Sequence, residues 1–228
     1  MTGAENGTTK RSRPRGLLAA VIVGGAALVA LVVVVTLGAV GPARSGGELH
    51  GTDMKGHSVT LDEGSGLTPK VVQEMHATAD TGSDFEIPSV GLTVPLGSLQ
   101  MTSNTITPPG FASAYQVRNL GVAPAHAAEG TVFVAMHSCR NGAICPGNYV
   151  IDVQNQKAKV GIGATIDVAG VSYTVTGTQA IGKTSISQDS SVWANTPNRL
   201  VVITCLQRPQ GGPSVDNMVI IANRTPTP

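Results

Sequence analysis

The chain contains the run Leu200-Val201-Val202-Ile203-Thr204-Cys205, in which five apolar or β-branched residues lead directly to a cysteine. Such a run is typical of a buried β-strand, because branched side chains pack well on a pleated surface. An earlier run, Thr131-Val132-Phe133-Val134-Ala135-Met136-His137, has the same texture and ends in a histidine. A thiol and an imidazole at the ends of two strands suggest an enzyme that uses a cysteine thiolate.

Short runs of this kind continue through the C-terminal part of the chain, separated by Gly, Pro, Asn and Asp. They predict a mainly β domain, and closing the strands into a barrel would hide the edges of the sheet. The dipeptide Ala169-Gly170 predicts a tight hairpin in which the glycine supplies a positive φ. The expected strands are residues 86–96, 131–137, 149–153, 164–168, 171–176, 199–205 and 217–222.

An uncharged apolar segment, residues 16–40, lies near the N-terminus. Its 25 residues would span roughly 37 Å as a helix, which exceeds the roughly 30 Å of a bilayer's hydrocarbon core. We expect one transmembrane helix rather than a cleaved signal, although the small residues 41–43 also allow cleavage. A basic flank stays in the cytoplasm, so we expect a single-pass cell membrane protein with an extracellular C-terminal domain. The flanking residues are Lys10, Arg11, Arg13 and Arg15.

Composition completes this division of the chain. The 15 Lys and Arg side chains nearly balance the 14 Asp and Glu side chains, so nothing in the charge indicates nucleic acid binding. The stretch after the apolar segment is rich in Gly, Ser, Thr and Asp and predicts a linker with one short helix near residues 70–76. The predicted parts are a cytoplasmic tail (1–15), the anchor (16–40), an extracellular linker (41–84), a catalytic domain (85–224) and a frayed tail (225–228).

Three cysteines allow at most one internal disulfide and leave one thiol over in an oxidising compartment. Cys139 and Cys145 flank a turn-forming Asn-Gly pair, so a local disulfide between them is geometrically plausible and would leave Cys205 free. A redox or zinc site that uses these cysteines and His137 is an alternative. Zinc sites favour shorter cysteine spacings, so we expect no metal and no cofactor. The simpler alternative for Cys205 is an inert, buried thiol.

Several segments, in order, resemble the sortases, which are cysteine transpeptidases of Gram-positive cell surfaces. The resemblance covers about residues 85–224. Residues 87–92 (IPSVGL) resemble the family's opening strand, residues 130–138 (GTVFVAMHS) its G-T-x-hydrophobic-x-G-H strand, and residues 201–205 (VVITC) its T-L-x-T-C strand. A fourth segment, DNMVIIA after Val215, is similar to the R-D-N-V-V-V-x-A ending of the actinobacterial class E and F sortases.

The resemblance implies a fold and an activity. The fold would be an eight-stranded β-barrel with short helices. The activity would be cleavage of an LPXTG- or LAXTG-type signal between Thr and Gly, through a thioacyl intermediate on Cys205 with His137 as proton donor. The acyl group would pass to a cell-wall amine. The partners would be secreted proteins with a C-terminal sorting signal, a cell-wall precursor amine and membrane lipid.

The sequence departs from the family pattern at two positions. Val215 stands where sortases have an arginine that orients the peptide and stabilises the oxyanion, and Met136 replaces the glycine before the histidine. Losing an oxyanion donor costs about 100- to 1,000-fold in rate. We expect Arg208, three residues after the nucleophile, to supply the missing charge, with Arg140 as a second candidate. A module that has lost catalysis and only binds a peptide is the alternative.

We expect the substrate to lie near the nucleophile and the segment before its strand. The backbone of Thr204 would give electrostatic support to the reaction. Ile186 and Trp193 would offer apolar surface to the peptide, if they are not simply part of the core.

Overall fold

The computed structural model describes residues 50–60 and 68–226. The predicted cytoplasmic tail and anchor lie outside these residues. Among the described residues, no helix combines the length and the apolar character needed to cross a bilayer.

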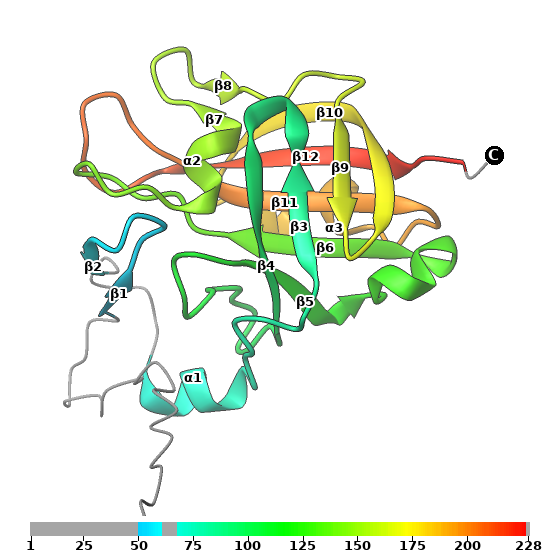
Figure 1. Cartoon of the computed structure of the whole chain (residues 1–228), viewed down its shortest axis with the longest axis horizontal. Helices are drawn as coiled ribbons and strands as arrows, with labels where there is room; N and C mark the ends of the chain where they lie inside the picture. Colours follow the sequence, from blue (N-terminus) through cyan, green and yellow to red (C-terminus); the bar gives the residue numbers. More distant parts are fainter. Residues whose placement is uncertain (1–49, 61–67, 227–228) are drawn as a thin grey trace, which may run out of the picture. The chain divides into compact units, whose positions relative to one another are not determined.

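Eight strands close into a barrel in the order β10-β12-β11-β6-β5-β4-β3-β9 (Figure 1). The pairs β6–β11 and β4–β5 are parallel, and the other neighbours are antiparallel. This architecture confirms the predicted mainly β fold and its eight-stranded barrel. The strands are β3 (Asp84–Ile87), β4 (Leu92–Leu99), β5 (Ala114–Gly121), β6 (Thr131–Met136), β9 (Thr165–Val168), β10 (Val171–Gly182), β11 (Arg199–Leu206) and β12 (Asp216–Arg224).

Short elements surround the barrel. The predicted linker contains a small hairpin and the short helix α1, close to where a helix was expected. A second small hairpin, β7–β8, follows helix α2. The bounds are β1 (His50–Thr52), β2 (Ser58–Thr60), α1 (Pro69–Glu74), η1 (Pro88–Val90), η2 (Pro124–Glu129), α2 (Pro146–Val150), β7 (Ile151–Asp152), β8 (Lys157–Ala158), η3 (Ile186–Gln188) and α3 (Ser190–Trp193).

Three details of the predicted strands need correction. The stretch 86–96 is two strands separated by η1, which begins with a proline. Residues 149 and 150 belong to α2, where Pro146 starts the helix and the Asn148 side chain accepts the N–H of the N-cap residue Cys145. Only residues 151 and 152 are extended. Strand β5 was not predicted.

Strand β6 is buried along its whole length because both of its faces are covered. Val132, Val134 and Met136 point into the barrel, where they join the larger core cluster. Phe133 and Ala135 point outward into a second cluster. An apolar run without alternation is what a strand covered on both sides requires.

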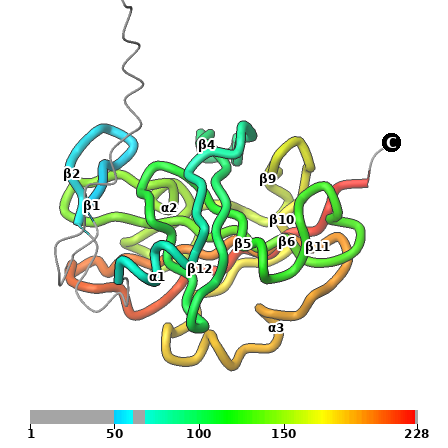
Figure 2. Tube along the Cα trace, turned by 90° about the horizontal axis from the view of Figure 1, so that it is seen from below, coloured from blue at the N-terminus to red at the C-terminus, as the bar shows by residue number. Residues whose placement is uncertain are grey.

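The segment between β10 and β11 supplies the outer cover of β6. It carries η3 and α3, and Figure 2 shows it as a long excursion from the strands. Two anchors hold its end: the Thr131 hydroxyl donates to the Ala194 carbonyl at 2.9 Å, and the buried Arg199 guanidinium donates to three carbonyls, those of Ser191, Val192 and Ala194. The Trp193 ring stacks on Phe133, with 5.9 Å between centroids.

The β9–β10 hairpin turns where the sequence predicted it. Both turn residues have positive φ, 53° at Ala169 and 78° at Gly170. Two positive φ values in a two-residue loop match the twist of the flanking strands. The Asp167 carboxylate accepts the Gly170 N–H at 2.7 Å and stabilises the turn.

Candidate active site

The parallel pairing of β6 and β11 brings His137 next to Cys205. The register pairs Val201 with Phe133 and Ile203 with Ala135, and ends with Thr204 opposite Met136. His137 and Cys205 stand one position beyond that last pair. Adjacent strands lie about 4.8 Å apart, so the two backbones are neighbours.

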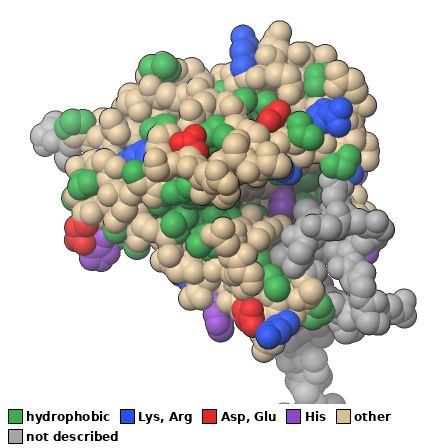
Figure 3. All heavy atoms as spheres, turned by 180° about the vertical axis from the view of Figure 1, so that it is seen from behind, with side chains coloured by type: hydrophobic (Ala, Val, Ile, Leu, Met, Phe, Trp, Pro, Cys, Tyr) green, Lys and Arg blue, Asp and Glu red, His purple; other side chains and the backbone are tan. Residues whose placement is uncertain are grey.

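Both side chains face the same cavity. In strands, alternate residues share a face, so His137 follows Phe133 and Ala135, while Cys205 follows Val201 and Ile203, on the outer side of the barrel wall. A cavity of about 770 Å³ there is lined by His137, Cys205, Ala135 and Ile203 among others. The face of the molecule in Figure 3 is hollowed, and hydrophobic side chains gather in the hollow.

Cys205 carries a free thiol and is partly exposed. It lies in β11 opposite Asn217 of β12, and Asn217 also lines the cavity. A partly exposed thiol that faces a cavity next to an imidazole can act as a nucleophile, which an inert core cysteine cannot.

His137 is 8% exposed, and its surroundings fix its tautomer. Nε2 lies 2.7 Å from the Pro108 carbonyl, which can only accept, so Nε2 carries a hydrogen. In the neutral ring, Nδ1 is then the nitrogen that can take a proton. The ring stacks on Phe111, with 4.8 Å between centroids.

The surroundings of His137 also decide its charge. Burial lowers the pKa of His137 below its usual 6.5, the bond to Pro108 opposes the shift, and the positive charge of Lys183 adds to it. The imidazole is therefore neutral at pH 7 and can accept the proton of a thiol.

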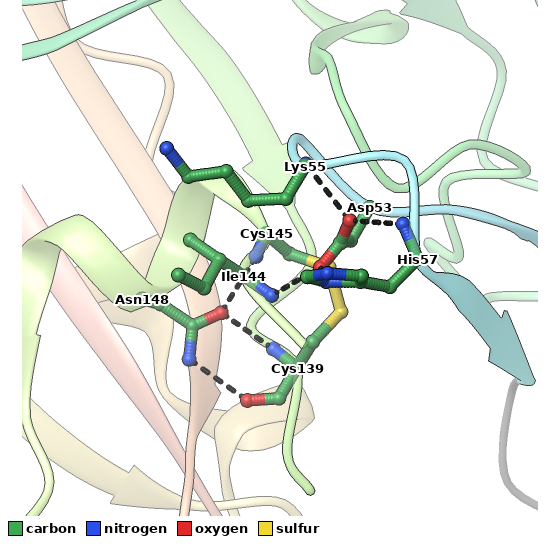
Figure 4. A network of polar contacts seen from close by, with 7 residues as sticks. All are labelled: Asp53, Lys55, His57, Cys139, Ile144, Cys145 and Asn148. Atoms are coloured by element: carbon green, nitrogen blue, oxygen red, sulfur yellow. Dashed lines mark hydrogen bonds and ion pairs between the residues drawn. A yellow bond between two sulfur atoms is a disulfide. The ribbon is translucent and has the colours of Figure 1, made fainter. Parts of the chain in front are cut away.

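The loop that follows His137 is closed by a disulfide between Cys139 and Cys145, with Cα atoms 5.4 Å apart. Asn148 of α2 holds both ends: its Oδ1 accepts the N–H groups of Cys139 and Cys145 at 2.8 Å, and its Nδ2 donates to the Cys139 carbonyl at 2.8 Å (Figure 4). Gly147 donates its N–H to the His137 carbonyl at 2.7 Å. A Cβ at Gly147 would lie 2.7 Å from that carbonyl, so only glycine allows this approach.

The β1–β2 hairpin binds the same loop. The buried Asp53 carboxylate accepts the Ile144 N–H at 2.8 Å and the Lys55 and His57 N–H groups at the same distance (Figure 4). Burial opposes ionisation of Asp53, but the N–H donors of Ile144, His57 and Lys55 outweigh it and hold the pKa of the carboxyl well below its usual range. Met54 adds an N–H bond to the Ile144 carbonyl at 2.9 Å.

The residues expected to meet the substrate all line the cavity: Thr204, Ile186 and Trp193. The Trp193 indole N–H donates to the Ile186 carbonyl at 2.6 Å, which fixes the ring at the cavity wall. Thr204 is buried, and its hydroxyl has no hydrogen-bond partner in the part of the chain that the structure describes. A Cβ at Gly147 of α2 would lie 2.1 Å from that hydroxyl, so the Thr204 side chain packs closely against the backbone of α2.

The structure places the candidate cations differently. Arg208 is exposed on the loop after β11 and is not among the described residues that line the cavity, and Arg140 lies half-buried in the disulfide loop. Val215 is 56% exposed just before β12. Lys183, directly after β10, lines the cavity and is the one side chain with a permanent charge among its described lining residues. No local sequence pattern marks Lys183, which lies 22 residues before Cys205 and reaches the cavity only through the fold.

A metal site finds no support in the described residues. No group of three or more His, Cys, Asp or Glu side chains within them could hold an ion. Cys139 and Cys145 are joined to each other, so neither offers a thiolate ligand.

Searches against protein-family models and curated proteins found no match. Among solved structures, the chain is similar to sortase A from Listeria monocytogenes, at 22% identity and a TM-score of 0.46, over 65% of this chain and 89% of that one. It is also similar to a lid mutant of sortase A from Corynebacterium diphtheriae (16%, TM-score 0.46, 68% and 75%) and to sortase C-1 from Actinomyces oris (16%, TM-score 0.45, 71% and 84%). At these values the likeness does not assign an activity, which must be inferred from the site.

Proposed function

We propose that this chain is a membrane-anchored cysteine transpeptidase of the sortase type, which cleaves an LPXTG- or LAXTG-type sorting signal between Thr and Gly. The observation that carries the proposal is the register of β6 and β11, which sets His137 beside Cys205 with both side chains at one cavity. The sequence segments around these two residues resemble those of sortases, which favours this chemistry over other thiol chemistry.

The reaction follows from the two side chains. The Cys205 thiol gives its proton to the neutral His137 imidazole, and the sulfur attacks the carbonyl carbon of the Thr. The bond to Gly breaks as the imidazolium returns the proton to the leaving amine. A thioester remains on Cys205, and the amine of a cell-wall precursor attacks it, forming a new amide and freeing the thiol.

The cavity suits a peptide with apolar side chains. One wall is apolar, while Lys183 provides positive charge for the oxyanion that develops when sulfur attacks. The role of Arg208 in stabilising that charge remains a prediction from the sequence. The apolar lining residues include Met101, Ile106, Leu120, Ile186 and Trp193.

The test is incubation of the full chain, in detergent micelles, with fluorogenic peptides that carry LPXTG or LAXTG and an added amine. We expect cleavage and a thioacyl adduct on Cys205 in mass spectrometry. Cys205→Ala is expected to lower the rate at least about 1,000-fold, because no other group forms the thioester.

A catalytically impaired peptide-binding module is the second candidate. It is favoured by Val215 and by the lack of an arginine among the cavity-lining residues that the structure describes. Peptide binding to folded protein, with a titratable Cys205 thiol but neither cleavage nor adduct, would select this alternative.

A further inference from the structure

The parallel ladder between β6 and β11 ends just before the two reacting side chains. Its last pair is Thr204 with Met136, so the ladder itself does not fix the backbone of His137 against that of Cys205. Geometry at this point matters for catalysis, because a misplacement of about 1 Å between reacting groups can cost about 100-fold in rate.

Side-chain hydrogen bonds connect the two strand ends beyond the ladder. The Ser138 hydroxyl donates to the carbonyl of Cys205 at 2.5 Å. The Gln207 side-chain amide donates from Nε2 to the Ser138 carbonyl at 2.8 Å and to the Ser138 hydroxyl oxygen at 2.9 Å. Each bond joins the residue that follows the histidine to the nucleophile or to the second residue after it.

These bonds are well defined in direction. The Ser138 carbonyl can only accept, so Nε2 of Gln207 must face it, and the Ser138 hydrogen is then directed to the Cys205 carbonyl. Ser138 is 7% exposed and Gln207 is 8% exposed, so water competes little for these groups. Gln207 also lines the cavity.

We propose that Ser138 and Gln207 are positioning residues, which clip the end of β6 to the end of β11 and hold the His137 imidazole in reach of the Cys205 sulfur. This inference rests on the proposed pairing of His137 with Cys205. Their hydrogen bonds reach the Cys205 carbonyl and each other, so both residues act on the backbone that carries the reacting side chains.

Loss of the clip should affect the stability of the fold less than it affects the pairing of His137 with Cys205. Oε1 of Gln207 is buried without a hydrogen-bond partner among the described residues. Gln207→Met removes this unsatisfied oxygen together with the two bonds from Gln207 to Ser138, so the two effects on stability partly cancel. The change in the relative positions of His137 and Cys205 is not offset in this way.

The test measures how strongly the alkylation of Cys205 by iodoacetamide depends on His137. The full chain in detergent micelles is alkylated between pH 5 and pH 9, with and without His137→Ala, in the wild type and in Gln207→Met. In the wild type we expect His137→Ala to change the rate about 10-fold and to alter its pH profile. In Gln207→Met, or in Ser138→Ala if the first variant does not fold, we expect the change to fall below about three-fold.

Two controls separate positioning from general loosening. Ser138→Thr keeps the hydroxyl and should retain the wild-type dependence on His137. Gln156→Met removes the bonds from Gln156 Nε2 to the Gln207 carbonyl at 2.9 Å and to the Val153 carbonyl at 2.6 Å, leaves the three clip bonds in place, and should also retain the dependence on His137.

The outcomes are separable from those of the peptide assay. The inference is overturned if the clip variant that folds, Gln207→Met or Ser138→Ala, keeps the full dependence on His137, if Gln156→Met loses it equally, or if the wild type shows none. If the peptide is cleaved but the clip variant keeps the dependence on His137, the proposed function is supported and the positioning role is not. If the clip variant loses the dependence of alkylation on His137 but no peptide is cleaved, the positioning role is supported and the proposed function is not.

Discussion

The loops that follow the two candidate catalytic residues are built in opposite ways. The loop after His137, residues 138–145, is closed by a disulfide, held at both ends by Asn148 and bound from outside by Asp53. The loop after Cys205, residues 207–215, is mostly exposed and contains two adjacent glycines with positive φ. The comparison suggests that the proton-transfer side is fixed in advance, while the nucleophile side leaves room for a substrate.

Opening the disulfide of the closed loop should have the largest effect on stability. Its cysteines are six positions apart, and for a loop this short the entropy of closure corresponds to about 2 kcal/mol. Cys139→Ser with Cys145→Ser should therefore lower the free energy of unfolding by about 2 to 4 kcal/mol, measured in urea. Adding reductant to the wild type should reproduce the loss and should not change the double variant. Equal stability of the two proteins would show that the loop is held by its hydrogen bonds alone.

Asn148 provides the next largest test of the closed loop. Asn148→Ala leaves the N–H groups of Cys139 and Cys145 without their acceptor next to buried sulfur, which should cost about 1 to 3 kcal/mol in urea unfolding. Asn155→Ala is the matched control, because Asn155 is exposed and bonds only Asp152 among the contacts described for it. A similar cost for both variants would remove any special role of Asn148.

The sequence predicted the barrel because the strands carry their own signals. Strands β6 and β11 are apolar on both faces, and the Ala-Gly pair marks the β9–β10 turn. Strand β5 carried a weaker signal: its second half is exposed, and it contains Arg118 and Asn119. The β1–β2 hairpin could not be predicted, since three-residue strands gain stability only from partners such as Ile144, far away in the sequence.

The candidate site divides in the same way. The apolar runs that end at His137 and Cys205 could be recognised locally, but the parallel pairing of β6 with β11 that brings the two residues together could not. Lys183, Gln207 and Asn148 could not be recognised either, because their roles depend on contacts across the fold that no local pattern encodes.

The burial of His137 predicts a dependence of stability on pH. Its pKa is lowered in the folded state, so below about pH 6.5 the unfolded chain binds a proton that the folded chain refuses, and stability falls as the pH decreases. The melting temperature should therefore drop between pH 7 and pH 5. His137→Gln should show a smaller drop over the same interval. An identical drop in both proteins would place the titrating group elsewhere.

The smallest expected effect is on kcat/KM and comes from Lys183, the cation that lines the cavity. Lys183→Gln removes the charge that lines the cavity and should lower kcat/KM for a cleaved peptide about two- to five-fold, since the side chain is exposed and screened by solvent. It should also raise the pKa of His137, because the positive charge of Lys183 contributes to lowering it, and thus shift the pH profile upward.

Arg208→Gln is the matched comparison, because it also removes one exposed positive charge, but from outside the described cavity lining. If Lys183 alone serves the oxyanion, kcat/KM should change less than about two-fold and the pH profile should not shift. A loss of 100-fold or more in Arg208→Gln would instead mean that the loop after Cys205 closes over the substrate and brings Arg208 to the oxyanion. The open loop would then be the part of the site that substrate binding completes, and the contrast with the closed histidine loop would describe the empty enzyme only.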